Sequence, residues 1–223
     1  MAIGVNTGES VQAKERAILA PARGHMFSML DGRRGVAAVI VVLFHYSWFL
    51  GWQIVPNAYL AVDFFFVLSG FVIAHAYEAR LLAGQTLGDF LRTRLVRLYP
   101  LYWLGLTIPV GLVAVETWLG QPHLQRTLVA TSYLFGAALL PAPDSLSVMP
   151  FRVFPLNAPA WSLSVEIGIN AIYAATVKSL STGRLVVVAF AAGVGLVALC
   201  VYFQSANLGY SWSNYIGGWF RVT

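Results

Sequence analysis

The sequence contains few charged residues and a single cysteine. Charged side chains make up only 10% of its 223 residues and hydrophobic ones 58%, which excludes an ordinary soluble domain. With Cys200 alone, the chain can form neither an internal disulfide nor a thiolate metal cluster. The sequence also lacks HExxH, paired-cysteine and phosphate-binding glycine-loop motifs, so it predicts neither a metal site nor nucleotide hydrolysis. The net charge of +5 does not indicate nucleic-acid binding, because the arginines lie in short segments between apolar runs.

The main feature of the sequence is its long apolar runs. Several approach or exceed the ~18 residues expected of a helix that crosses the hydrocarbon core of a membrane. The sequence therefore predicts an all-α fold, a polytopic transmembrane helical bundle with about five to seven membrane segments. We place the spans at residues 35–54, 58–77, 99–119, 160–178 and 185–204, and residues 214–223 resemble the start of another helix.

The arginines predict the orientation of these spans. Residues 1–28 are mixed and polar, and residues 78–97 hold several arginines, so placing both in the cytoplasm collects most of the positive charge there. The stretch 127–140 is short and flanked by prolines, which favours a re-entrant or interfacial segment over a full span. We therefore expect a multi-pass protein of the plasma (inner) membrane with a flexible cytoplasmic tail at residues 1–28 and a membrane domain at 29–223.

His45 lies within the first apolar run, eleven residues after Arg34. Eleven helical residues return to nearly the same face and rise ~16 Å, so in a bilayer ~30 Å thick Arg34 lies at one interface and His45 near mid-depth. An ionisable residue at that depth is costly and indicates function. Imidazole titrates near neutral pH, so His45 is suited to take a proton from an attacking hydroxyl. The alternatives are a packing role for His45 and an interfacial anchor for Arg34.

Arg94 and Arg97 form a second candidate. Their spacing of three residues places both guanidiniums on one helix face, a geometry that suits phosphate groups. The excess of positive charge on the cytoplasmic side explains such a pair equally well without a ligand.

Two later spans also contain candidate functional residues. Asp63 lies near the outer end of the 58–77 span, and Ser69 and Gly70 lie near its middle. Ser69 is suited to hydrogen-bond a substrate, whereas Gly70 is expected to let helices approach closely. Glu166 lies about two turns into the 160–178 span, a depth that indicates functional or network use.

Four of these segments, in this order, resemble acyltransferase family 3, the membrane enzymes that O-acetylate surface polysaccharides and related glycans. The matching segments are LDGRRGVAAVIVVLFH, AVDFFFVLSGFVIAHAY, RTRLVRLYPLYW and APAWSLSVE. The resemblance implies an O-acyltransferase that uses cytoplasmic acyl-coenzyme A, commonly acetyl-coenzyme A, as donor substrate and has no permanently bound cofactor. It also implies as partners a glycan or lipid-linked saccharide acceptor at the opposite membrane face and the membrane lipids.

The resemblance further implies roles for residues that match its motifs. Arg34 and His45 match an arginine and a histidine with ten residues between them, and Glu166 closes a Trp-Ser-Leu-Ser-Val-Glu element. We expect catalytic roles for His45, Glu166 and Asp63, donor binding by Arg34, Arg94, Arg97 and Ser69, and no metal ligands.

Family members carry more spans than this chain, so the resemblance implies a C-terminally truncated acyltransferase domain. Two other functions stay open. The first is a proton-coupled transporter in which His45, Asp63 and Glu166 form a relay. The second is an inactive, truncated acyltransferase-like protein.

Overall fold

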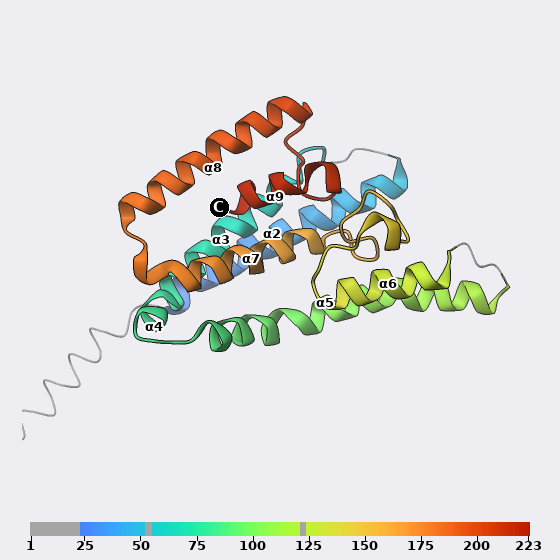
Figure 1. The fold of residues 1–223 in the computed structure, drawn as a ribbon, viewed down its shortest axis with the longest axis horizontal. Coiled ribbons are helices and arrows are strands. Elements are labelled where there is room, and N and C mark those ends of the chain that lie inside the picture. The colour runs from blue at the N-terminus through green and yellow to red at the C-terminus, as the bar shows by residue number, and fades with distance from the viewer. Residues whose placement is uncertain (1–22, 52–54, 121–123) are drawn as a thin grey trace, which may run out of the picture. The chain divides into compact units, whose positions relative to one another are not determined.

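The computed structural model describes residues 23–51, 55–120 and 124–223. The chain divides into two compact units, Met1–Ala61 and Val62–Thr223, and each is described by itself. The residues that the structure describes are mostly helical and contain no extended strand; Arg152 and Ser211 form an isolated antiparallel bridge (Figure 1). The prediction of an all-α fold is confirmed.

The first unit consists mainly of helix α2 (Arg23–Leu50), which is 28 residues long. It carries both Arg34 and His45. The helix begins before the predicted span of 35–54, so residues 23–28 of the predicted tail are helical. Residues 1–22 lie outside the described part of the chain.

The second unit contains the remaining helices. Helix α3 begins two residues before the division between the units. The α-helices are α3 (Leu60–Ala76), α4 (Glu78–Leu82), α5 (Leu87–Trp118), α6 (Arg126–Ala137), α7 (Ala160–Thr176), α8 (Thr182–Phe203) and α9 (Tyr215–Val222). Three short 3-10 helices are η1 (Asp144–Leu146), η2 (Val177–Ser179) and η3 (Trp212–Asn214).

Helix α5 is longer than the predicted span of 99–119. It begins at an N-cap, because the Thr86 side chain accepts a hydrogen bond from the backbone N–H of Asp89. Asp89 also places an acidic side chain in the first turn, where it favours the helix. The arginine-rich segment predicted as a connection is therefore largely helical and continuous with the apolar part of α5, through Pro100 and Pro109.

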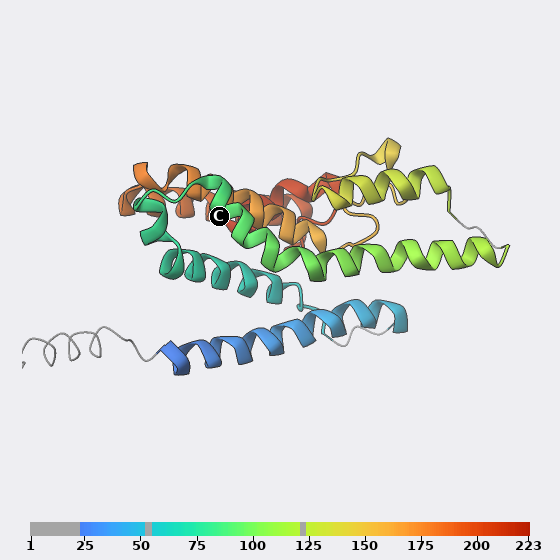
Figure 2. The same cartoon turned by 90° about the horizontal axis from the view of Figure 1, so that it is seen from below.

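Among the described residues, the two helices α5 and α8 are long and apolar enough to cross a membrane, and α3 is a shorter apolar helix of 17 residues. The predicted count of five to seven segments is therefore not confirmed. Helix α6 has 12 residues, which span ~18 Å at 1.5 Å per residue, less than a hydrocarbon core of ~30 Å. It packs along α5 (Figures 1 and 2), and its length favours the re-entrant or interfacial interpretation.

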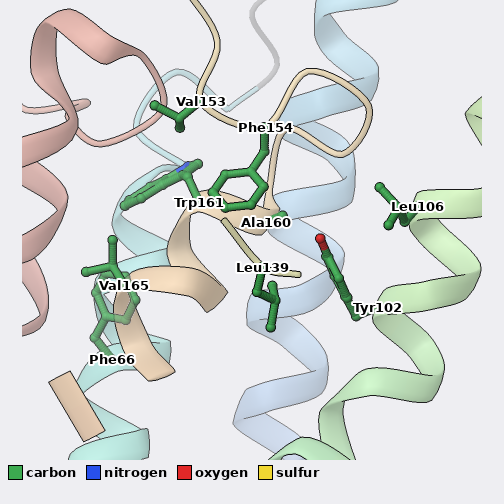
Figure 3. Packing of buried hydrophobic residues seen from close by; sticks show 9 residues of the cluster. All are labelled: Phe66, Tyr102, Leu106, Leu139, Val153, Phe154, Ala160, Trp161 and Val165. Carbon is green, nitrogen blue, oxygen red and sulfur yellow. The ribbon is translucent and has the colours of Figure 1, made fainter. Parts of the chain in front are cut away.

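A hydrophobic core centred on Trp161 fixes α7 against its neighbours. Side chains from α3, α5 and α7 meet there with Val153 and Phe154 of the segment before α7 (Figure 3). The rings of Phe66 and Trp161 pack edge to face, with centroids 6.2 Å apart. Because this core holds the first turn of α7, it determines where the polar residues further along that helix lie.

Candidate active site

Three polar side chains from three helices meet inside the second unit. We call Ser69 of α3, Arg94 of α5 and Glu166 of α7 the polar cluster. Arg94 Nη2 donates to Glu166 Oε1 at 2.8 Å and to Ser69 Oγ at 2.9 Å. Ser69 Oγ donates to the same Glu166 oxygen at 2.5 Å. The sequence analysis selected all three residues from separate segments, and the structure brings them together.

Burial explains why the polar cluster is so closely bonded. The side chains of Arg94 and Glu166 are only 9% and 17% exposed, so each charge needs a partner to offset its lost hydration. Ser69 donates its hydrogen bond to the same carboxylate oxygen that pairs with Arg94. The arrangement therefore suits Ser69 to hold the ion pair in place rather than to act as a nucleophile.

Arg97 lies in a different environment from Arg94. Arg94 is buried, whereas Arg97, less than one turn further along α5, is exposed. The spacing of the two residues places their backbones on one side of α5, but only one guanidinium enters the protein interior. Arg94 is paired with Glu166, and Arg97 is the member of the pair whose side chain is exposed.

A second ion pair ties the end of the chain to α3. Arg221 Nε donates to Asp63 Oδ1 at 2.7 Å, and Arg221 Nη1 donates to the carbonyl of Leu208 at 2.8 Å. The guanidinium carbon also lies 5.4 Å from the ring centroid of Trp161, in cation–π contact. We call this group the Arg221 clamp. The Arg221 side chain is 2% exposed and that of Asp63 is 36% exposed.

The sequence analysis missed Arg221. An available signal was its place in an apolar segment, where an arginine is costly unless it has a partner. Asp63 and Glu166, predicted to act together, belong to separate ion pairs. Asp63 and Ser69 are six residues apart, which is ~9 Å along α3. Phe66 lies between them in sequence and packs on Trp161.

The comparisons with known proteins agree with this arrangement of motifs. The family model for the acyltransferase domain of acyltransferase family 3 matches residues 28–222. The chain belongs to acyltransferase family 3. A curated relative, "Protein 2 in picA locus" from Rhizobium radiobacter, is 43% identical over 157 residues, which cover 66% of this chain and 81% of the relative. No solved structure matches the chain.

Membership of acyltransferase family 3 indicates a membrane acyltransferase. The polar cluster takes one residue from each of three segments on which the resemblance to this family rests: Ser69, Arg94 and Glu166. These segments are far apart in the sequence, since 97 residues separate Ser69 from Glu166. The family segments therefore converge in the protein interior.

The remaining segment of the acyltransferase 3 resemblance lies on α2, in the first unit. Arg34 is half-buried, and His45 is exposed with its ring 5.5 Å from that of Phe44 at an interplanar angle of 71°. The roles predicted for Arg34 and His45 rest on their spacing along α2 and on the family.

Gly70 does not have the role that the sequence suggested. A Cβ added there would meet no atom within 4 Å among the described residues. The expected close approach at Gly70 is absent from this part of the structure because its neighbour Ser69, rather than Gly70, is the buried residue. Within the described ranges, no group of three or more His, Cys, Asp or Glu side chains could hold a metal ion.

Proposed function

We propose that this member of acyltransferase family 3 transfers an acyl group, in the first instance acetyl, from acyl-coenzyme A to a hydroxyl of a glycan or lipid-linked saccharide. The observation that carries the proposal is the polar cluster, in which three family segments meet as a buried, hydrogen-bonded ion pair. A buried charge network of this kind is costly to build and is typical of functional sites in membrane proteins.

The proposed reaction is a direct transfer. The acceptor hydroxyl oxygen attacks the carbonyl carbon of the thioester, and the carbon–sulfur bond breaks. The hydroxyl proton passes to His45, which then protonates the departing coenzyme A thiolate. The products are the O-acyl acceptor and free coenzyme A. His45 is assigned as the base from its place in the Arg34–His45 segment of α2.

Donor binding is assigned to two arginines outside the polar cluster. Arg97 is exposed on α5, and we propose that it and Arg34 bind the phosphates of coenzyme A. Because Arg94 is paired with Glu166, we assign it to the uncharged part of the donor. The role of Asp63 in orienting the acceptor stays a prediction, and its bond to Arg221 gives it a structural role as well.

The proposed location is the plasma (inner) membrane, with the N-terminus and the arginine-rich 78–97 segment in the cytoplasm. That orientation places positive charge on the cytoplasmic side and gives Arg97 access to cytoplasmic donor. A proton-coupled transporter is less well supported, because Asp63 and Glu166 are each bonded to an arginine rather than aligned as a relay.

Radiolabelled acetyl-coenzyme A tests the proposal. Membranes that contain the wild-type chain should transfer label to a saccharide fraction, and the His45→Ala variant should lose at least about 100-fold of this activity, the usual contribution of a general base. His75→Ala is the matched control, since His75 is an exposed histidine stacked on Phe71 near the end of α3. Membrane fractionation checks that both variants are inserted. Full transfer by His45→Ala would refute the assigned base, and pH-driven solute flux without label transfer would favour the transporter.

A further inference from the structure

Two buried hydrogen-bond donors beside the ion pair of the polar cluster are unused. Arg94 Nε and Asn170 Nδ2 have no hydrogen-bond partner among the described residues. Both residues are more than nine-tenths buried, with 7% of Arg94 and 5% of Asn170 exposed. A buried donor without a partner costs about 1–3 kcal/mol, and native proteins retain few of them. Two such donors in one region indicate that an acceptor atom belongs there.

Both donors belong to residues linked to Glu166, one by an ion pair and the other by its place on α7. Arg94 Nε belongs to the same planar guanidinium as Nη2, which lies 2.8 Å from Glu166 Oε1. Asn170 lies four residues after Glu166 on α7, so it is on the same helix face one turn further on. The unused donors therefore come from two packed helices, α5 and α7, which the Arg94–Glu166 ion pair joins.

The charge of the site restricts the acceptor that it can take. A phosphate would bring negative charge next to the Glu166 carboxylate in a buried region, where repulsion is strong. A carbonyl oxygen is uncharged in the ground state and accepts two hydrogen bonds. During acyl transfer it gains negative charge, which an arginine N–H and an amide N–H stabilise. A small carbonyl fits this pair of donors better than a phosphate does.

We propose that Arg94 Nε and Asn170 Nδ2 bind the carbonyl oxygen of the acyl thioester. The inference rests on the proposed function and adds Asn170, which lies outside the residues predicted from the sequence. Glu166 and Ser69 hold the guanidinium so that Nε is presented to the thioester, and Asn170 supplies the second hydrogen bond. Arg94 thus acts on the reacting end of the donor, separately from the phosphates.

Two coenzyme A analogues that cannot transfer an acyl group test the site. One is the ketone in which a methylene replaces the sulfur of acetyl-coenzyme A, and the other is S-ethyl-coenzyme A, a thioether without a carbonyl. The purified full chain should bind the ketone about tenfold more tightly than the thioether, as expected for hydrogen bonds that include a charged donor. In Asn170→Leu and Asn170→Ala the ratio of the two affinities should fall towards one.

Thermal unfolding separates this effect from misfolding. Because Asn170 Nδ2 has no partner within the described part of the chain, Asn170→Leu should leave the unfolding midpoint unchanged or raise it. Asn207→Leu, in the loop after α8, is the matched control and should keep the preference for the ketone. Equal binding of both analogues by the wild type, or an unchanged ratio in the folded Asn170 variants, would overturn the carbonyl site alone. Binding of neither analogue would overturn the acyl-coenzyme A donor as well.

Discussion

The polar cluster and the Arg221 clamp each pair a buried arginine with a carboxylate from another helix, but they use the arginine differently. In the clamp, Arg221 binds a carboxylate, a backbone carbonyl and the face of Trp161. In the polar cluster, Arg94 Nη2 makes two bonds to side chains while Nε has no partner among the described residues. An arginine whose interactions lie within the protein holds helices together, whereas one with an unused buried donor is prepared for a ligand.

Loss of Arg94 should have the largest effect. In Arg94→Met, Glu166 keeps a largely buried charge without its partner, which costs about 3–5 kcal/mol of unfolding free energy. Transfer per folded molecule should also fall by at least about 100-fold, as when a donor to a developing oxyanion is removed. Chemical unfolding in detergent and labelled transfer measure the two effects. The double variant Arg94→Met/Glu166→Met should regain stability without activity, and recovery of activity would contradict the functional role.

Loss of Arg221 should affect stability more than transfer. Arg221→Met removes the ion pair, the bond to Leu208 and the contact with Trp161, which together should cost about 3 kcal/mol of unfolding free energy. The estimate lies at the lower end for a buried pair because Asp63 is partly hydrated. The transfer rate per folded molecule should fall far less than in Arg94→Met, because the variant reaches the proposed site only through Asp63. Arg184→Met, at an exposed arginine, is the control and should stay within about 0.5 kcal/mol of wild type.

A serine inside the polar cluster and a serine outside it test the same comparison with smaller effects. Ser69→Ala should lower the unfolding free energy by about 1 kcal/mol and also slow transfer, because Ser69 aligns Arg94 with Glu166. Ser164→Ala removes a bond to the carbonyl of Leu139 and should cost a similar free energy without slowing transfer. Equal transfer rates in the two folded variants would remove Ser69 from the functional site.

Glycine substitutions should change stability with opposite signs in the two regions, and Gly70→Ala should have the smallest effect. Gly70, next to Ser69, has open space, so Gly70→Ala should stabilise α3 by about 0.5–1 kcal/mol through helix propensity. A Cβ at Gly168 would lie 2.5 Å from the ring of Trp219, so Gly168→Ala should destabilise by about 1–3 kcal/mol. Unfolding midpoints measure both, and destabilisation by Gly70→Ala would show that the space beside Ser69 is filled in the working protein.

The sequence predicted the members of the polar cluster but not their contact. Ser69, Arg94 and Glu166 stand out because polar groups are costly in apolar runs. Their convergence depends on how three helices rotate and pack, which no local pattern contains. The different burial of Arg94 and Arg97 also depends on how the helices rotate and pack. Arg221 was missed because its partner lies 158 residues away, and Asn170 because an uncharged amide in an apolar run is a weaker signal.

Helix boundaries were predictable where turn-forming residues precede a helix. The predicted spans of 58–77 and 160–178 lie close to α3 and α7, which follow Pro56-Asn57 and Pro159. The start of α5 was missed because its first turns are rich in arginine, which is typical of a connection between spans, whereas in the structure Thr86 caps a helix there. Length and composition alone also could not fix the number of membrane segments, since α3 and α7 have only 17 residues each.

Helix α7 contributes to both ion pairs, because Trp161 lies under Arg221 and Glu166 bonds to Arg94. Four residues lie between these two positions, so a single insertion there would turn Glu166 by about 100° around the helix relative to Trp161. One of the two contacts would then be lost whichever way the helix settled. We therefore expect working relatives to tolerate substitutions between the tryptophan and the glutamate but no change in the length of that segment, a constraint that an alignment of active enzymes can check.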